Sequence, residues 1–343
     1  MKILKIYGYF LLVFYSCPSV KALIDLEVMA QDFVIQAKRI VLADDYPHAF
    51  NPSLVRWQGK LLMSFRVVPN KVHPFNSWLG VVWLDDNFNQ IGKPQRLYPN
   101  EKNKHTPSRA EDGRLLSVGK RLYLVYSDNT QTVVSKGGFR MHVAQVEWNG
   151  EKFFLKDVEC ISSFAGASSN RREKNWVPFE YGNQLLLAYS ITPHLIFHSL
   201  RATGYCETFV YSEKKIKWQW GELRGGTPAL LDGDQYLAFF HSSLPLRTVH
   251  SHGANVMHYV IGAYTFSAKP PFEITHVSSE PIIGKQFYTG AEYEHYWKPV
   301  RVVFPCGFIK DNQYIWLSYG RQDHELWVAK IDKKRLYQSL IKI

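Results

Sequence analysis

One strand–turn–strand unit recurs five times along the chain, and this repeat constrains the fold more than any other feature. Each copy pairs two apolar strands across a turn that contains glycine, asparagine or aspartate, residue types that favour tight hairpins. The second strand of each copy closes with an aromatic residue: Phe65, Tyr126, Tyr189, Phe240 and Tyr319. These aromatics lie 61, 63, 51 and 79 residues apart. The hairpin therefore keeps its length while the connecting segments vary, which is typical of a repeat architecture.

Further strand-like segments follow most of the hairpins, at residues 78–83, 141–146, 258–264 and 325–329. Each repeat thus offers about four short strands, which is the content of one propeller blade. The sequence predicts an all-β fold in which residues 23–343 form a single five-bladed β-propeller domain, with about four antiparallel strands per blade. A generic β-sandwich would leave the five copies of one hairpin unexplained.

Residues 1–22 have the pattern of a signal peptide. Lys2 and Lys5 precede an apolar stretch at residues 6–15, and the segment Val20-Lys21-Ala22 leaves small residues at the usual cleavage spacing. The apolar stretch is short for a membrane span. An uncleaved anchor is the alternative, and it would be the only contact of the chain with a membrane. We therefore predict a secreted or periplasmic protein.

Cysteine and histidine patterns indicate neither a disulfide scaffold nor a metal centre. After residue 22 the chain keeps Cys160, Cys206 and Cys306, which allow one disulfide at most and do not indicate which pair would form it. Three histidines between residues 250 and 258 lack the companion carboxylate or cysteines of a recognisable site. No metal is predicted.

The chain is basic, with 41 Lys and Arg residues against 30 Asp and Glu residues and a net charge of +11. Its longest run of basic residues is Lys333-Lys334-Arg335, so no basic arm supports binding to nucleic acid. The excess of positive charge instead favours an anionic substrate or phosphate.

The starts of the five hairpins are expected to converge. In a propeller the innermost strand of each blade runs along the central axis, so the residues at its mouth meet those of the other blades. Counting 14 residues back from the closing aromatics gives Asn51, Asp112, Asn175, Gly226 and Pro305. Charged and amide side chains surround these positions, so the sequence predicts one polar pocket at the mouth of the ring.

Five short motifs mark these hairpin starts, in a fixed order from about Phe50 to Lys330. They are Asn51-Pro52, Glu111-Asp112-Gly113-Arg114, Lys174-Asn175, Gly226-Thr227-Pro228 and Phe304-Pro305-Cys306-Gly307. In this order they resemble glycoside hydrolase family 130, which contains β-mannoside phosphorylases and β-mannosidases, and the related β-mannosyltransferases on the same scaffold.

The resemblance implies roles for particular residues. Asp112 stands where the family carries its proton donor, with Gly113 in place of the usual proline, and Asn175 is an amide where many members have an acid. The residues that the resemblance and the mouth of the ring together assign to substrate binding are Asn51, Arg66, Arg114, Lys174, Asn175, Thr227, His241, Tyr319 and Asp323.

These residues predict an exported enzyme that cleaves or transfers β-linked mannosyl units of an oligosaccharide or glycoconjugate by an inverting step, with Asp112 as general acid. An inverting hydrolase needs a second carboxylate about 6.5–9.5 Å away, for which Glu173 and Asp323 are candidates. A phosphorylase needs cations to hold phosphate instead. Inorganic phosphate or a sugar-phosphate is the only co-substrate predicted, and phosphorolysis, hydrolysis and transfer stay open. The alternative is a catalytically inactive propeller that binds a glycan or a protein.

Overall fold

The computed structural model describes residues 23–42, 46, 48–69, 76–99, 109–129, 138–168, 171–291 and 299–343, and the predicted signal segment lies outside these ranges. Three sheets are regular blades of four antiparallel strands, in chain order from the axis outward. They are β2 (Ala49–Trp57), β3 (Lys60–Val67), β4 (Trp78–Leu84) and β5 (Gln90–Leu97); β6 (Glu111–Val118), β7 (Arg121–Asp128), β8 (Arg140–Trp148) and β9 (Phe153–Cys160); and β10 (Val177–Tyr181), β11 (Gln184–Ser190), β12 (His194–Leu200) and β13 (Tyr205–Ser212).

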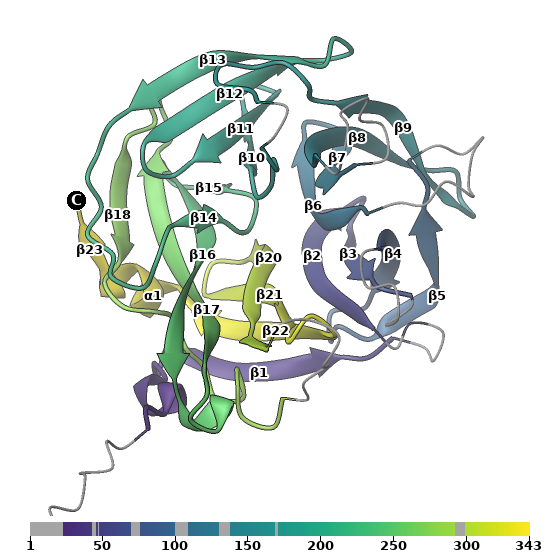
Figure 1. The fold of residues 1–343 in the computed structure, drawn as a ribbon. Helices are drawn as coiled ribbons and strands as arrows, with labels where there is room; N and C mark the ends of the chain where they lie inside the picture. The colour runs from purple at the N-terminus through teal and green to yellow at the C-terminus, as the bar shows by residue number, and fades with distance from the viewer. Residues whose placement is uncertain are drawn as a thin grey trace, which may run out of the picture.

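The last blade joins the two ends of the described chain. It consists of β20 (Val303–Lys310), β21 (Tyr314–Arg321) and β22 (Glu325–Asp332), with β1 (Val34–Ile40) as its outer strand. The antiparallel register of β1 and β22 runs from Val34 opposite Ile331 to Ile40 opposite Leu326. Because one blade contains both early and late residues, its hydrogen bonds close the ring (Figure 1).

The remaining sheet departs from the predicted four-stranded pattern. It has seven strands, which are β14 (Arg224–Gly225), β15 (Leu230–Asp232), β16 (Gln235–Arg247), β17 (Asn255–Ser267), β18 (Ile274–Ser278), β19 (Val300–Arg301) and β23 (Leu340–Lys342). Its inner strand is split into β14 and β15, which both pair with β16, and β19 pairs with β17 in parallel. The prediction of five blades with about four strands each is therefore wrong in the number of blades. The all-β propeller consists of four regular blades and this larger sheet.

The hairpin starts carry irregularities that aim their side chains. The register between inner and second strand shifts at Phe50/Ser53, at Glu111/Arg114 and at Pro305/Gly307. Such bulges redirect side chains next to functional sites. Asn51, Asp112 and Asn175 have positive φ angles of 51°, 54° and 64°, a region that Asn and Asp tolerate better than other side chains do. The amide and acid residues at these positions therefore also fit the backbone.

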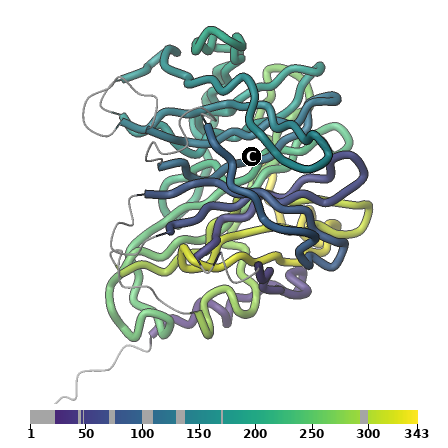
Figure 2. Tube along the Cα trace, turned by 90° about the vertical axis from the view of Figure 1, so that its right-hand side faces the viewer, coloured from purple at the N-terminus to yellow at the C-terminus, as the bar shows by residue number. Residues whose placement is uncertain are grey.

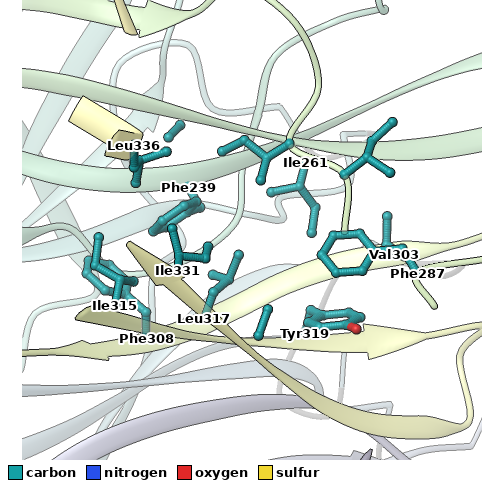
Figure 3. Packing of buried hydrophobic residues seen from close by; sticks show 14 of the residues in the cluster. Phe239, Ile261, Phe287, Val303, Phe308, Ile315, Leu317, Tyr319, Ile331 and Leu336 are labelled. Atoms are coloured by element: carbon teal, nitrogen blue, oxygen red, sulfur yellow. The ribbon is translucent and has the colours of Figure 1, made fainter. Parts of the chain in front are cut away.

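Apolar side chains fill the spaces between neighbouring sheets. Figure 3 shows one such cluster, in which Phe239 and Ile261 of the seven-stranded sheet pack with Phe308, Leu317 and Tyr319 of the last blade. The short helix α1 (Lys333–Ser339) adds Leu336 to this cluster, and Asp332 caps its first turn by accepting a hydrogen bond from the Arg335 backbone N–H. The blades are thus fixed relative to one another, which gives the residues at the mouth a rigid support.

The described chain begins beside the long β16–β17 hairpin. A short 3-10 helix η1 (Leu26–Met29) follows the first residues, and a second one, η3 (Val249–Ser251), lies in the β16–β17 connection. Ile24 and Thr248 form a parallel bridge between the two segments, which project together at one end of the molecule (Figure 2). The thiols of Cys160, Cys206 and Cys306 are free. No helix in the described ranges combines the length and apolar character that a membrane crossing requires.

Candidate active site

Asp112 lies where the hairpin starts of the first three blades meet. It is 8% exposed, and its carboxylate accepts a hydrogen bond from Asn51 Nδ2 at 2.7 Å and lies 3.5 Å from Arg66 Nη1. Burial alone would raise the pKa of Asp112. The charges of Arg66 and Arg114 and the hydrogen bond from Asn51 outweigh burial and hold this pKa below its ordinary value. In the free protein Asp112 is therefore a carboxylate.

Glu111 organises two of the cations around Asp112. Its carboxylate accepts a hydrogen bond from Arg66 Nη2 at 3.0 Å and a second, short one from Lys174 Nζ. Arg66 comes from the first blade and Lys174 from the segment that leads into the third. Glu111 thus links three blades, because one buried acid is shared by two cations. We call this group of side chains the polar cluster; it consists of Asn51, Arg66, Glu111, Asp112, Arg114, Lys174 and Asn175.

Arg114 links Asp112 to the third blade and to the seven-stranded sheet. It is 1% exposed, and it donates hydrogen bonds to the Asp112 carbonyl at 2.9 Å and to Asn175 Oδ1 at 3.1 Å. Its Nε donates to the carbonyl of Gly226. Pro305 packs against Gly226. The structure therefore brings together all five predicted hairpin starts, at Asn51, Asp112, Asn175, Gly226 and Pro305.

Phe139 is a residue that sequence reasoning missed. It is fully buried, and three cations lie over its ring: Lys174 Nζ at 4.2 Å, Arg109 at 4.9 Å and Arg172 at 5.8 Å from the centroid. The ring face attracts cations and thereby gathers charges that would otherwise repel one another. Phe139 lies outside the hairpin repeat and next to no motif, so no signal in one sequence points to it.

His241 is present at the mouth, but as a neutral ring. It is buried between Tyr259, whose ring is stacked on it at 5.9 Å, and Phe304, at 4.6 Å. Burial, with the charges of Arg114 and Arg224, lowers the pKa of His241 to about 3. Its Nδ1 has no hydrogen-bond partner among the described residues. His241 therefore adds no positive charge near neutral pH, but it can exchange a hydrogen bond with a ligand.

Asp323 is a third carboxyl group near Asp112 and Glu111. It lies in the turn between β21 and β22 with a positive φ of 55°. Burial raises the pKa of Asp323 to about 6, and the negative charges of Asp112 and Glu111 add to this effect while Arg66 and Lys174 oppose it. Asp323 can therefore hold a proton at a pH where Asp112 does not.

Two predicted binding residues have other surroundings. The Thr227 hydroxyl is fully buried, accepts a hydrogen bond from the Phe239 backbone N–H at 3.0 Å and donates one to the Pro228 carbonyl at 2.8 Å. Tyr319 lies in the apolar cluster of Figure 3, with its ring 4.7 Å from that of Phe287. The structure does not bring these two side chains into the polar cluster. Both belong to the scaffold behind it.

A cavity of 420 Å³ opens beside the cluster, between the third blade and the seven-stranded sheet. Lys174 and Asn175 line it and also belong to the cluster. Tyr189, which the sequence marks only as a closing aromatic, lines it too. Within the described ranges, no group of three or more His, Cys, Asp or Glu side chains could hold a metal ion.

This arrangement of an acid, a ring of cations and an adjoining cavity fits a family match. The model of β-1,4-mannooligosaccharide phosphorylases in glycoside hydrolase family 130 matches residues 25–340. The chain belongs to glycoside hydrolase family 130. Members of this family are β-mannoside phosphorylases and glycoside hydrolases, so the predictions of the family and of an enzyme are confirmed at that level.

Solved structures show the same fold at low sequence identity. A putative glycosidase from Bacteroides thetaiotaomicron is 18% identical with a TM-score of 0.59, covering 88% of this chain and 94% of its own. The β-1,2-mannobiose phosphorylase from Listeria innocua is 14% identical with a TM-score of 0.55, covering 85% and 91%. A mannose phosphorylase from Leishmania mexicana, in complex with a phosphate ion, is 12% identical with a TM-score of 0.59, covering 93% of each chain. No curated protein sequence matches the chain.

Proposed function

We propose that this family 130 protein cleaves a β-mannosidic bond with inversion, using Asp112 as general acid and inorganic phosphate as acceptor. The observation that carries the proposal is the position of Asp112, a buried acid within reach of Arg66 and beside Arg114 and Lys174. An inverting phosphorylase needs one acid and a set of cations, and the cluster holds both. The phosphate complex of the Leishmania mexicana relative supports the choice of acceptor.

The step moves one proton and one glycosyl group. A phosphate oxygen attacks the anomeric carbon from the face opposite the leaving group while the glycosidic oxygen takes a proton from Asp112. The β-mannosidic C–O bond breaks, and the products are α-mannose 1-phosphate and a glycan shortened by one unit. Phosphate brings its own nucleophilic oxygen, so no second carboxylate is needed to activate water.

Asp112 must gain a proton before this step, although its pKa is lowered in the free protein. A phosphate dianion that binds near Arg66, Arg114 and Lys174 would offset their charge and raise the pKa of Asp112. Asp323, whose pKa is raised to about 6, would hold the proton of the pair until phosphate binds. Two carboxyl groups that influence each other in this way titrate as a unit.

The test compares products with and without phosphate. The full chain is incubated with β-mannobiose, and sugars are separated chromatographically. We expect mannose 1-phosphate together with mannose only when phosphate is present. The Asp86→Asn variant is the control, because Asp86 forms an exposed ion pair with Arg56, and it should behave as the unaltered chain. The absence of any product in both buffers would contradict the proposal and favour a binding protein.

Hydrolysis is the second candidate, and the raised pKa of Asp323 favours it. A carboxyl group near the acid that loses its proton near pH 6 has the properties of a general base for water. In the same experiment, release of mannose without phosphate would identify hydrolysis. Loss of that release in Asp323→Asn would assign the base.

We also propose that the enzyme acts outside the cytoplasm. The charged and apolar pattern of residues 1–22 supports export. Expression of the full chain in a bacterium, followed by mass spectrometry of the exported protein, should find a chain that begins at Leu23. A protein that stays in the cytoplasm with residues 1–22 attached would contradict this.

A further inference from the structure

We infer that the 420 Å³ cavity between the third blade and the seven-stranded sheet is the leaving-group subsite, and that it takes a sugar carrying an oxyanion, a phosphate monoester or a carboxylate. This inference rests on the proposed function and adds the class of substrate. The residues that carry it are Arg171, Arg172, Glu173, Lys174, Arg224 and Tyr189, all of which line the cavity.

Glu173 indicates that the cavity is built for a ligand. This side chain is 2% exposed, and its Oε2 accepts a hydrogen bond from Trp176 Nε1 at 3.4 Å. Its Oε1 has no hydrogen-bond partner among the described residues, and Arg171 Nε lies 3.8 Å away. A buried carboxylate oxygen without a hydrogen bond is costly. A sugar hydroxyl that enters the cavity can donate the missing bond.

The charges around Glu173 indicate that the ligand is anionic. Four cations line the cavity, Arg171, Arg172, Lys174 and Arg224, against two acids, Glu173 and Glu222. Arg172 has no ion pair within the part of the chain that the structure describes. Arg171, Lys174 and Arg224 pair with Glu173, Glu111 and Glu222. A neutral sugar would therefore leave the charge of Arg172 uncompensated, whereas guanidinium groups bind phosphate and carboxylate oxygens in pairs of hydrogen bonds.

The cavity adjoins the reacting groups, which makes it a leaving-group subsite. Lys174 bonds to Glu111, which directly precedes Asp112, and Asn175 bonds to Arg114, two residues after Asp112. Tyr189 lines the cavity, and the Arg171 guanidinium lies over its ring, 5.3 Å from the centroid. A sugar held here reaches toward the acid that protonates its departing oxygen.

Calorimetric titration of the full chain tests the inference with four probes: mannose, mannose 6-phosphate, glucuronic acid and inorganic phosphate. We expect mannose 6-phosphate and glucuronic acid to bind at least about tenfold more tightly than mannose. Arg172→Gln should lower this preference about fivefold or more. Glu173→Gln should weaken all three sugars. Arg56→Gln is the control: it alters an exposed ion pair with Asp86, and neither residue lines the cavity. It should leave the affinity for all four probes unchanged.

Three results would overturn the inference. Equal binding of mannose and mannose 6-phosphate would show an uncharged subsite. Inorganic phosphate binding as tightly as mannose 6-phosphate, with the same loss in Arg172→Gln, would make the cavity a phosphate site only. If Arg172→Gln still binds mannose 6-phosphate more tightly than mannose by the wild-type factor, the anion binds elsewhere. Arg172 is exposed, so its variant should fold even if the variant of the buried Glu173 does not. Turnover of β-mannobiose with phosphate separates the proposals, because it can persist when the charge preference is absent.

Discussion

The central cluster and the cavity beside it are both rich in cations, but they differ in how those cations are satisfied. In the cluster Arg66 and Lys174 bond to Glu111, and Arg114 bonds to carbonyl and amide oxygens of three blades. In the cavity Arg172 has no ion pair within the described residues, and Arg224 pairs with an exposed acid, Glu222. The cluster therefore sets the charge of Asp112 through the fold itself, whereas the cavity keeps charge available for a ligand.

The largest effect is expected at the acid. Asp112→Asn keeps the size of the side chain and removes the proton donor, so turnover of β-mannobiose should fall roughly 100- to 10,000-fold. Steady-state assays of wild type and variant measure it, with thermal unfolding as a check on folding. If the variant retains turnover within a few-fold of wild type, the acid is another residue and the cluster serves only to bind.

The next effect concerns the stability of the cluster. Glu111→Gln leaves Arg66 and Lys174 without their shared acid, so the free energy of unfolding should fall by about 3 kcal/mol. The matched control is Asp86→Asn, which breaks an exposed pair and should cost less than about 1 kcal/mol. Urea denaturation of both variants measures the two values. Equal losses would show that the fold does not depend on the cluster.

Asp323 should give stability a pH dependence of its own. Its pKa is raised from 3.8 in the unfolded chain to about 6 in the fold, so the folded protein binds this proton more tightly. The resulting stabilisation is complete below about pH 4 and is lost as the pH rises through about 6. The unfolding free energy of wild type minus that of Asp323→Asn should therefore decrease across this window. The pKa of Asp112 is lowered, so this residue changes the free energy of unfolding only at a pH below this window. A flat difference would refute the shift.

The smallest effect is expected at Thr227, and it tests whether this residue supports the fold or binds substrate. Thr227→Val removes the hydroxyl that bonds to the Phe239 N–H, so unfolding should become easier by about 1–2 kcal/mol. Neither KM nor kcat for β-mannobiose should change, because this hydroxyl is directed to the backbone. A rise in KM without a loss of stability would return Thr227 to the substrate-binding residues.

The constant length of the hairpin was enough to predict which residues meet at the mouth. Asn51, Asp112 and Asn175 lie at equivalent points of three blades, so one offset finds them all. The side that each side chain faces depends on bulges, which shift the strand register without a clear sequence signal. Tyr319 was predicted at the site and lies in the core, as do the closing aromatics Phe65, Tyr126 and Phe240.

Charge and blade size were harder to predict. The neutral state of His241 follows from packing against Tyr259 and Phe304, which come from other strands. The seven strands of the larger sheet follow from the split between β14 and β15 and from the addition of β19 and β23 from distant parts of the chain. One sequence contains no information on such long-range pairing beyond the repeat itself.

Phosphorus NMR of the reaction shows whether Asp112 supports an inverting phosphorolysis, because it follows the acceptor and the stereochemistry together. The full chain is mixed with β-mannobiose and phosphate, and the first phosphorylated product is observed before it can equilibrate. We expect α-mannose 1-phosphate with wild type and no such signal with Asp112→Asn. Formation of the β-anomer, or an undiminished signal in the variant, would contradict the proposal.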